Sequence, residues 1–225
     1  MTADDDGRQL DRDVEGCAAA HQRLLAHLDQ LLEDGTLDGA VGAPSGLPGW
    51  SVGHVLAHIA RNADSFVHLT EAADRGEVAD QYPGGVEQRN GDIEAGSRRS
   101  ARELVRDVRT SIYALEQCWA TVGGAAWQGE GRAFAGMRPI RDLPFIRWRE
   151  VNVHHADLGL GYTMAEWPAE YVRLELIRAE MLWAARRPMG LTSLPAQALA
   201  AEPRARLAWL LGRGVIDGLE PAGIL

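Results

Sequence analysis

Two ionisable residues, Glu150 and His154, fall on the apolar side of a predicted helix. Residues 139–157 follow a helical pattern, and at about 100° per residue both side chains share one stripe with Leu143 and Val153. Burying a lone carboxylate costs several kcal/mol, so Glu150 should be paired, protonated or bound to a cation. A spacing of four residues places both head groups over one patch, with Cβ atoms about 5 to 6 Å apart, which suits two ligands of one metal ion.

A third candidate ligand comes from another helical segment, residues 51–74, whose apolar stripe passes close to His58. His54 lies on the same side of that helix one turn earlier, so the helical wheel ranks His58 above His54 without deciding between them. His155 points about 100° away from His154 and is left out of the predicted site. Two histidines and one glutamate from two helices would leave an open coordination position, as catalytic zinc sites do.

The same residues also have a structural interpretation. Single buried histidines are usually core residues with satisfied hydrogen bonds, and Glu150 could instead pair with an arginine of a facing helix. The spacing also lacks the specificity of the H-E-x-x-H zinc motif. On pattern alone, a cation site and a paired polar core therefore remain alternatives.

The elements that must position these side chains are amphipathic helices. Apolar residues recur at intervals of three and four over residues 10–32, 51–74, 100–120 and 139–157. Ser51 is the expected N-cap of the second of these helices, and Pro144 is acceptable near the start of the last one. The third belongs to a helical region, residues 86–122, that is broken near Gly96, while the Gly-rich stretches 35–49 and 123–138 are expected to be loops. Four long helices in this part of the chain predict a four-helix bundle.

The rest of the chain predicts a smaller second unit. A fifth helix is expected from Trp167 to about Arg187, with Pro188 and Gly190 ending it. Short apolar runs further on indicate a short helix with one or two strands. The fold class is therefore expected to be mainly α, with a small C-terminal α/β unit. The expected domains are residues 1–160 and residues 161–225.

The composition excludes several functional classes. The chain has 225 residues and a net charge of -9, which repels nucleic acid, and no local basic patch offsets it. All 23 basic residues are arginine, which rules out Schiff-base, pyridoxal phosphate and phosphate-loop lysines. No membrane span and no secretory signal are expected. Cys17 and Cys118 lie far apart and outside any C-x-x-C motif, which fits a reducing cytoplasm.

Three segments carry a more specific pattern. They are LPGWSVGHVLAHIARN at residues 47–62, YPGG followed by Arg89 and Asn90 at residues 82–90, and WREVNVHHADLG at residues 148–159. Together they resemble the mycothiol-dependent maleylpyruvate isomerase family, within the DinB-like metalloenzyme superfamily. The resemblance implies a DinB-like four-helix bundle that binds zinc or another divalent ion. The implied ligands are His58, Glu150 and His154.

The resemblance also implies that the C-terminal α/β unit covers the metal cleft and supplies an arginine. The sequence RLAWLLGR at residues 206–213 nominates Arg213 for this role, with Arg204 or Arg206 as alternatives. The structural interpretation of Arg213 is a cation beside a helix C-terminus, where it interacts favourably with the helix dipole.

Two further residues are candidates for binding. Arg89 follows the Gly84-Gly85 turn, where a loop could present its guanidinium group to a substrate carboxylate, although a solvated loop arginine is the alternative. Asn62, one turn beyond His58, could orient a ligand or donate to a bound thiol, unless it is simply a surface amide.

The implied reaction converts maleylpyruvate to fumarylpyruvate by reversible thiol addition, rotation about the resulting single bond, and elimination. Neither Cys17 nor Cys118 falls in a metal or base motif, so mycothiol would supply the sulfur, held as thiolate by the cation. One alternative is a mycothiol S-transferase that conjugates the thiol to an electrophile. A second is a metal-binding or structural bundle with no thiol dependence. The expected partners are mycothiol and a small substrate with carboxylates, and the expected state is a monomer or homodimer.

Overall fold

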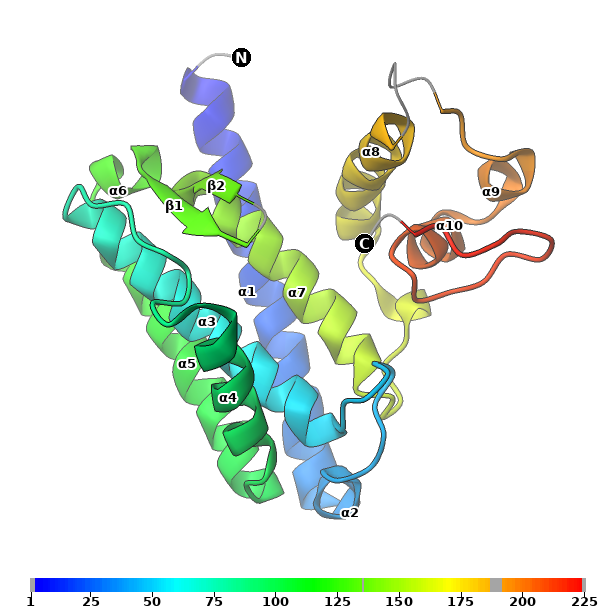
Figure 1. The fold of residues 1–225 in the computed structure, drawn as a ribbon, viewed down its shortest axis with the longest axis horizontal. Helices are drawn as coiled ribbons and strands as arrows, with labels where there is room; N and C mark the ends of the chain where they lie inside the picture. Colours follow the sequence, from blue (N-terminus) through cyan, green and yellow to red (C-terminus); the bar gives the residue numbers. More distant parts are fainter. Residues whose placement is uncertain (1–2, 135, 187–191, 224–225) are drawn as a thin grey trace. The chain divides into compact units, whose positions relative to one another are not determined.

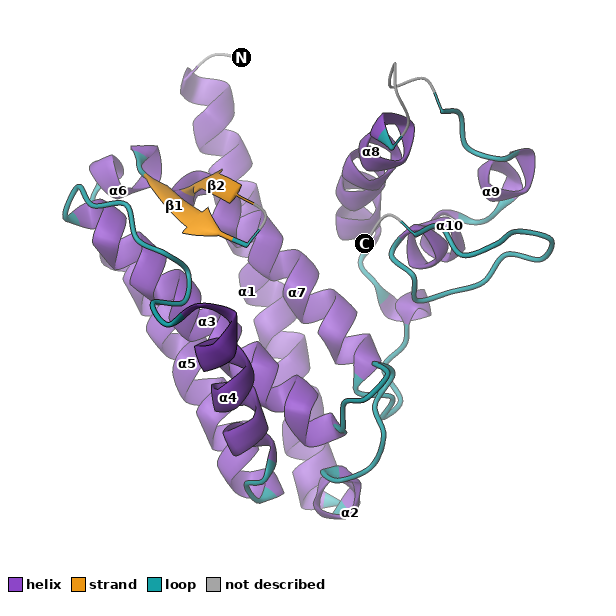
Figure 2. Ribbon diagram, viewed as in Figure 1, coloured by secondary structure: helices purple, strands orange, loops and turns teal. Residues whose placement is uncertain are grey.

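The computed structural model describes residues 3–134, 136–186 and 192–223, and the chain divides into two compact units, Met1–Leu160 and Gly161–Leu225. The first unit is built on four long helices, shown in Figures 1 and 2. These helices are α1 (Ala3–Glu33), α3 (Val52–Asp74), α5 (Ala101–Thr121) and α7 (Leu143–Asp157). The expected mainly α fold with a four-helix bundle is confirmed.

The four helices form a closed ring in which α1 packs on α7 and α5, and α3 packs on α5 and α7. Each turns an apolar stripe inward, and the core between them is made largely of fully buried aliphatic side chains. Examples are Leu24, Leu28, Leu56, Ile59, Leu104, Val108 and Ile112. None of the helices in the described part of the chain is long and apolar enough to cross a membrane.

The helix directions are set by contacts at the ends of the bundle. The backbone N–H of Gly123, just after α5, donates to the carboxylate of Asp74 at the end of α3 at 3.2 Å, so α3 and α5 run in the same direction. The backbone N–H of Gly46, ahead of α3, donates to the carbonyl of Asp157 at the end of α7 at 2.7 Å, so α7 runs against α3. Figure 1 shows α1 running beside α7 in the same direction.

Because α3 and α5 are parallel, the chain between them must travel back along the bundle. It does so through residues 75–84, called here the return segment, and through α4 (Gly85–Ser97), which packs on α3. Ahead of α3 lies the short helix α2 (Thr36–Ala40). This return brings residues 79–90 alongside the helix that carries His58.

Local sequence explains where the long helices start. The Ser51 side chain accepts a hydrogen bond from the backbone N–H of His54, and the His54 ring accepts one from the Ser51 backbone N–H, which together form a capping box. Ser100 and Glu103 form the same arrangement at the start of α5. The predicted N-cap Ser51 is therefore confirmed, as is the position of Pro144 in the first turn of α7.

The stretch 123–138, expected to be a loop, contains more structure than that. It forms α6 (Gly124–Gln128) and a hairpin of β1 (Glu130–Ala133) and β2 (Gly136–Pro139), paired antiparallel. Strands of four residues are too short to show the alternating pattern that reveals a strand in sequence. A single 3-10 turn, Ile140–Asp142, then leads into α7.

The second unit is helical in its described residues. It contains a 3-10 turn (Met164–Glu166), α8 (Ala169–Ala185), α9 (Ala196–Ala200) and α10 (Pro203–Leu210), with α10 packed on α8. Residues 161–186 and 192–223 contain no strand, so the α/β character expected of this unit is absent from its described part. The short helix expected from the apolar runs of this unit is present, since most of the run at residues 207–211 lies in α10. The expected helix end at Pro188 and Gly190 lies outside the described residues.

Candidate metal centre

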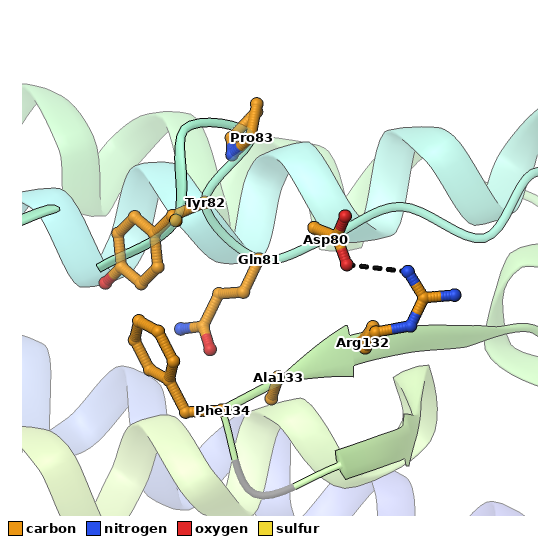
Figure 3. A pocket seen from close by; sticks show the side chains of 8 residues that line it. Asp80, Gln81, Tyr82, Pro83, Arg132, Ala133 and Phe134 are labelled. Carbon is orange, nitrogen blue, oxygen red and sulfur yellow. Dashed lines mark hydrogen bonds and ion pairs between the residues drawn. The ribbon is translucent and has the colours of Figure 1, made fainter. Parts of the chain in front are cut away.

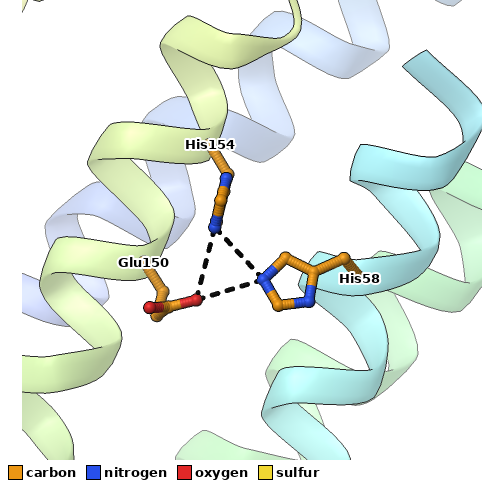
Figure 4. Close-up of side chains that lie close together, drawn as sticks. All are labelled: His58, Glu150 and His154. Carbon is orange, nitrogen blue, oxygen red and sulfur yellow. Dashed lines mark hydrogen bonds and ion pairs between the residues drawn. The ribbon is translucent and has the colours of Figure 1, made fainter. Parts of the chain in front are cut away.

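The side chains of His58, Glu150 and His154 converge between α3 and α7, as Figure 4 shows. The Nε2 atom of His58 lies 3.1 Å from Oε2 of Glu150 and 3.1 Å from Nε2 of His154. The third side of the triangle, from His154 Nε2 to Glu150 Oε2, is 3.4 Å. Within the described ranges of the chain, this trio is the one group of three or more possible metal-ligating side chains.

The trio is buried on its histidine side and open on its acid side. Only 6% of the His58 side chain and 12% of the His154 side chain is exposed, whereas a quarter of the Glu150 side chain, 25%, reaches solvent. Among the described residues, Glu150 pairs with the two imidazoles and with no arginine. The core ion pair that sequence left as the alternative is therefore not the arrangement found.

The far side of the His154 ring is held by a carboxylate. Its Nδ1–H donates to Oδ2 of Asp157 at 2.9 Å, one turn further along α7, and the Asp157 side chain is almost fully buried. This hydrogen bond fixes the ring orientation and directs Nε2 into the trio. Asp157 was not among the predicted site residues, although its spacing of three residues from His154 on the same helix was a usable signal.

The far side of the His58 ring meets Arg89 and Trp50. Nη2 of Arg89 lies 3.3 Å from Nδ1 of His58, so the guanidinium donates to this nitrogen. The Trp50 ring stands edge-on to the imidazole, with centroids 5.4 Å apart, and Arg89 lies over the same indole at 5.8 Å. Arg89 is thus beside the trio, but it belongs to α4 and not to a loop as expected.

The environment splits the two histidines into opposite protonation states. Burial lowers the pKa of His58 to about 4 despite its contact with Glu150. Burial also opposes charge on His154, but its hydrogen bonds to Asp157 and Glu150 outweigh burial and raise its pKa to about 9. Burial alone would raise the pKa of Glu150, yet the two imidazoles hold it well below its usual value. At neutral pH the trio is a neutral imidazole, an imidazolium and a carboxylate.

The other histidines near these helices have separate partners. His54, which the helical wheel left open, caps α3, and its Nε2 lies 3.0 Å from the carboxylate of Glu94. His155 is buried against α1, with its Nε2 2.8 Å from Nδ1 of His27. The structure therefore brings together the three residues that the sequence ranked first and leaves these two outside.

Asn62, the candidate for contacting a thiol, has its partner in the core. It is buried, and its Oδ1 accepts a hydrogen bond from Nη1 of Arg147 at 2.8 Å. Arg147 is itself completely buried and also donates to the Ile59 carbonyl at 2.9 Å and to Nε2 of His21 at 3.1 Å. It therefore ties α7 to α3 and α1 one turn before Glu150. This arginine was not predicted, since nothing in the sequence pattern marks which of many arginines is buried.

The C-terminal arginines lie in the second unit. Nη1 of Arg213 donates to the carbonyl of Leu211 at 3.0 Å, just past the end of α10, as expected for a cation at a helix C-terminus. The alternatives are also bonded to carbonyl groups of that unit, Arg204 to Trp167 and Arg206 to Ala198, both at 2.9 Å.

Comparison with known proteins agrees with this architecture. A model of the mycothiol maleylpyruvate isomerase N-terminal domain matches residues 7–159. No curated protein sequence matches the chain. Two solved structures are similar, a mycothiol-dependent maleylpyruvate isomerase and a histidine-to-alanine mutant of it, with TM-scores of 0.78 and 0.77. Each has 22% sequence identity and covers 91% of this chain and 90% of its own, so the likeness shows a shared fold.

Proposed function

The chain belongs to the mycothiol maleylpyruvate isomerase family, and from this premise we propose that it is a mycothiol-dependent isomerase converting maleylpyruvate to fumarylpyruvate. The observation that carries the proposal is the trio of His58, Glu150 and His154, because it supplies what activation of an external thiol requires. We also propose a reducing cytoplasm as its location, since the reaction needs mycothiol in its reduced form.

The three side chains fit a divalent cation, with zinc as the proposed ion. Ligands about 2.0 to 2.1 Å from a tetrahedral zinc ion stand about 3.3 Å from one another. The separations within the trio are 3.1, 3.1 and 3.4 Å. The donors are two imidazole nitrogens and one carboxylate oxygen, a set that zinc accepts, and three protein ligands would leave a position open for sulfur. The partly exposed side of Glu150 is the side open for entry.

The sulfur must come from outside the chain. Burial raises the pKa of Cys17 to about 12 and that of Cys118 to about 11, so both remain thiols at neutral pH. When bound, a divalent cation supplies the charge that keeps a thiol ionised at neutral pH. The thiolate then adds to the conjugated double bond of maleylpyruvate, the new single bond rotates, and elimination restores the thiol.

Arg89 is the proposed clamp for a substrate carboxylate. His58 can offer Nε2 to a cation only in the tautomer that carries its hydrogen on Nδ1. In that tautomer Nδ1 no longer accepts the hydrogen bond from Arg89, now 3.3 Å away. The guanidinium group is then free to bind a carboxylate and to stabilise the enolate that thiol addition produces. Arg213 of the C-terminal unit is proposed as a second clamp.

The test has two parts. Metal-loaded protein is incubated with maleylpyruvate, with and without mycothiol, and the products are separated by chromatography. Fumarylpyruvate that forms without net consumption of mycothiol supports the isomerase. A stable thioether identifies an S-transferase instead, and no reaction in either case leaves a bundle without thiol chemistry.

The metal is tested by substitution of the ligands. His58→Ala, Glu150→Ala and His154→Ala should each lose zinc, measured by elemental analysis after dialysis. His54→Ala is the matched control, because His54 lies one turn away on α3 and should leave the zinc content unchanged. Stoichiometric zinc in all three purified ligand variants would remove the proposed site.

A further inference from the structure

A hollow in the first unit, with a volume of about 270 Å³, lies between the return segment and β1 (Figure 3). Its two walls are joined by backbone hydrogen bonds of 2.8 Å, from Arg132 N–H to the Ala79 carbonyl and from Gln81 N–H to the Arg132 carbonyl. Two aromatic residues line it, Tyr82 from the return segment and Phe134 from the turn after β1. Their rings stack at 5.6 Å with an angle of 21°.

The side chains that line this pocket carry no net charge. Nη1 of Arg132 lies 2.7 Å from the carboxylate of Asp80, so the two charges compensate each other. The side-chain Nε2 of Gln81 donates to Oγ of Ser65 at 3.0 Å, while no described residue donates to its Oε1. Aromatic faces beside uncharged hydrogen-bonding groups and a compensated ion pair are chemically complementary to a neutral polyhydroxyl ring.

The pocket is within reach of the metal trio. Ser65, which contacts the pocket residue Gln81, lies seven residues after His58 on α3. Seven residues are two helical turns, so the two side chains share a face about 10 Å apart along the axis. Tyr82 of the pocket also lies seven residues before Arg89, which contacts His58, on the same connection between α3 and α5.

We propose that this pocket binds the sugar portion of mycothiol while the thiol reaches the trio, an inference that rests on the proposed function. Mycothiol joins a cysteine through an amide to an amino sugar that carries inositol. The amide link places the first sugar ring about 6 Å from the sulfur. With the sulfur at the trio, the sugar portion can therefore reach the pocket, which lies about 10 Å away. Maleylpyruvate fits the pocket poorly, because Arg132 is already paired with Asp80 and offers no free charge to its carboxylates.

Binding of a sulfur-free probe tests the proposal without turnover. N-acetylglucosaminyl-inositol is titrated into the wild-type protein by calorimetry, and into Phe134→Ala and Tyr113→Ala. The Phe134 side chain is 62% exposed and Tyr113, on α5, is 53% exposed, so neither change removes a core residue. Phe134→Ala should weaken binding about fivefold through loss of ring contact, and Tyr113→Ala should leave it unchanged. Glu150→Ala should also bind the probe as the wild type does, since the trio does not touch the sugar.

Three results would overturn the proposal. They are no binding of the probe to the wild type, equal binding by Phe134→Ala, or glucose binding as tightly as the probe, which would make this a general sugar pocket. The proposed function has its own test and fails if the wild type with mycothiol does not isomerise maleylpyruvate. The binding experiment shows whether the pocket binds the sugar portion, whatever the result of that activity assay.

Discussion

The protonation state of His154 determines how tightly the trio can hold a cation at a given pH. Its pKa is raised to about 9 because the hydrogen bonds to Asp157 and Glu150 outweigh burial. The pKa of His58 is lowered to about 4 by burial, and Glu150 is ionised. From about pH 5 to pH 8, cation binding must therefore displace one proton, and that proton leaves Nε2 of His154.

One proton displaced per cation fixes the size of the pH effect. The apparent affinity should rise about tenfold for each pH unit, by about a hundredfold from pH 6 to pH 8, and level off above about pH 9. Calorimetric titration of the metal-free protein with zinc, in buffers of different ionisation enthalpy, measures both the affinity and the number of protons released. We expect one proton per zinc ion at pH 7.

The variant Asp157→Asn tests whether protonation of His154, and not of another group, causes the pH dependence of zinc affinity. Asp157→Asn removes the first of the two carboxylate contacts that keep His154 charged, so the affinity should level off at a lower pH than in the wild type. A zinc affinity that stays constant between pH 6 and pH 8, or the release of no proton at pH 7, would refute the reasoning, because His154 would then be neutral in the free protein.

Three further predictions concern stability and the role of the cysteines. Gly16→Ala should lower the free energy of unfolding by about 1 to 3 kcal/mol in denaturant titration, because its Cβ would lie 2.5 Å from an indole ring of α7, whereas Gly7→Ala on the same helix meets nothing and should not destabilise. Arg147→Met should cost about 3 kcal/mol, since it removes hydrogen bonds to three buried acceptors, and Arg147→Lys should recover part of this in the same assay. The double variant Cys17→Ser and Cys118→Ser should keep isomerase activity with added mycothiol, and a folded but inactive protein would contradict an external thiol.

The bundle was predictable because its signals are local. Apolar residues at intervals of three and four marked the long helices, and Ser51 marked the start of α3 through a capping box. The hairpin at 130–139 was not predictable, since four-residue strands carry too little pattern. Short apolar runs likewise do not separate a strand from a buried helix, so the sequence left both open for the second unit, where most of the run at 207–211 lies in α10.

The site was predictable only where the relevant geometry belongs to one helix. The wheel positions of Glu150, His154 and His58 put each of them on a buried stripe, and the structure brings them together. The contacts of Arg89 and Tyr82 depend instead on how the return segment crosses the bundle, which no local pattern encodes. Tertiary topology therefore supplied what the sequence of each element could not.

Two neighbouring helices that point the same way require a crossover, and here that crossover passes beside His58 of the trio. The proposed cation ligands lie on α3 and α7, whereas Tyr82 and Arg89 come from the connection between α3 and α5. In the proposed function, reactivity and selectivity are thus carried by separate stretches of polypeptide. Insertions or deletions in the crossover could change which molecules are admitted while leaving the ligands in place, a route by which one scaffold acquires new substrates.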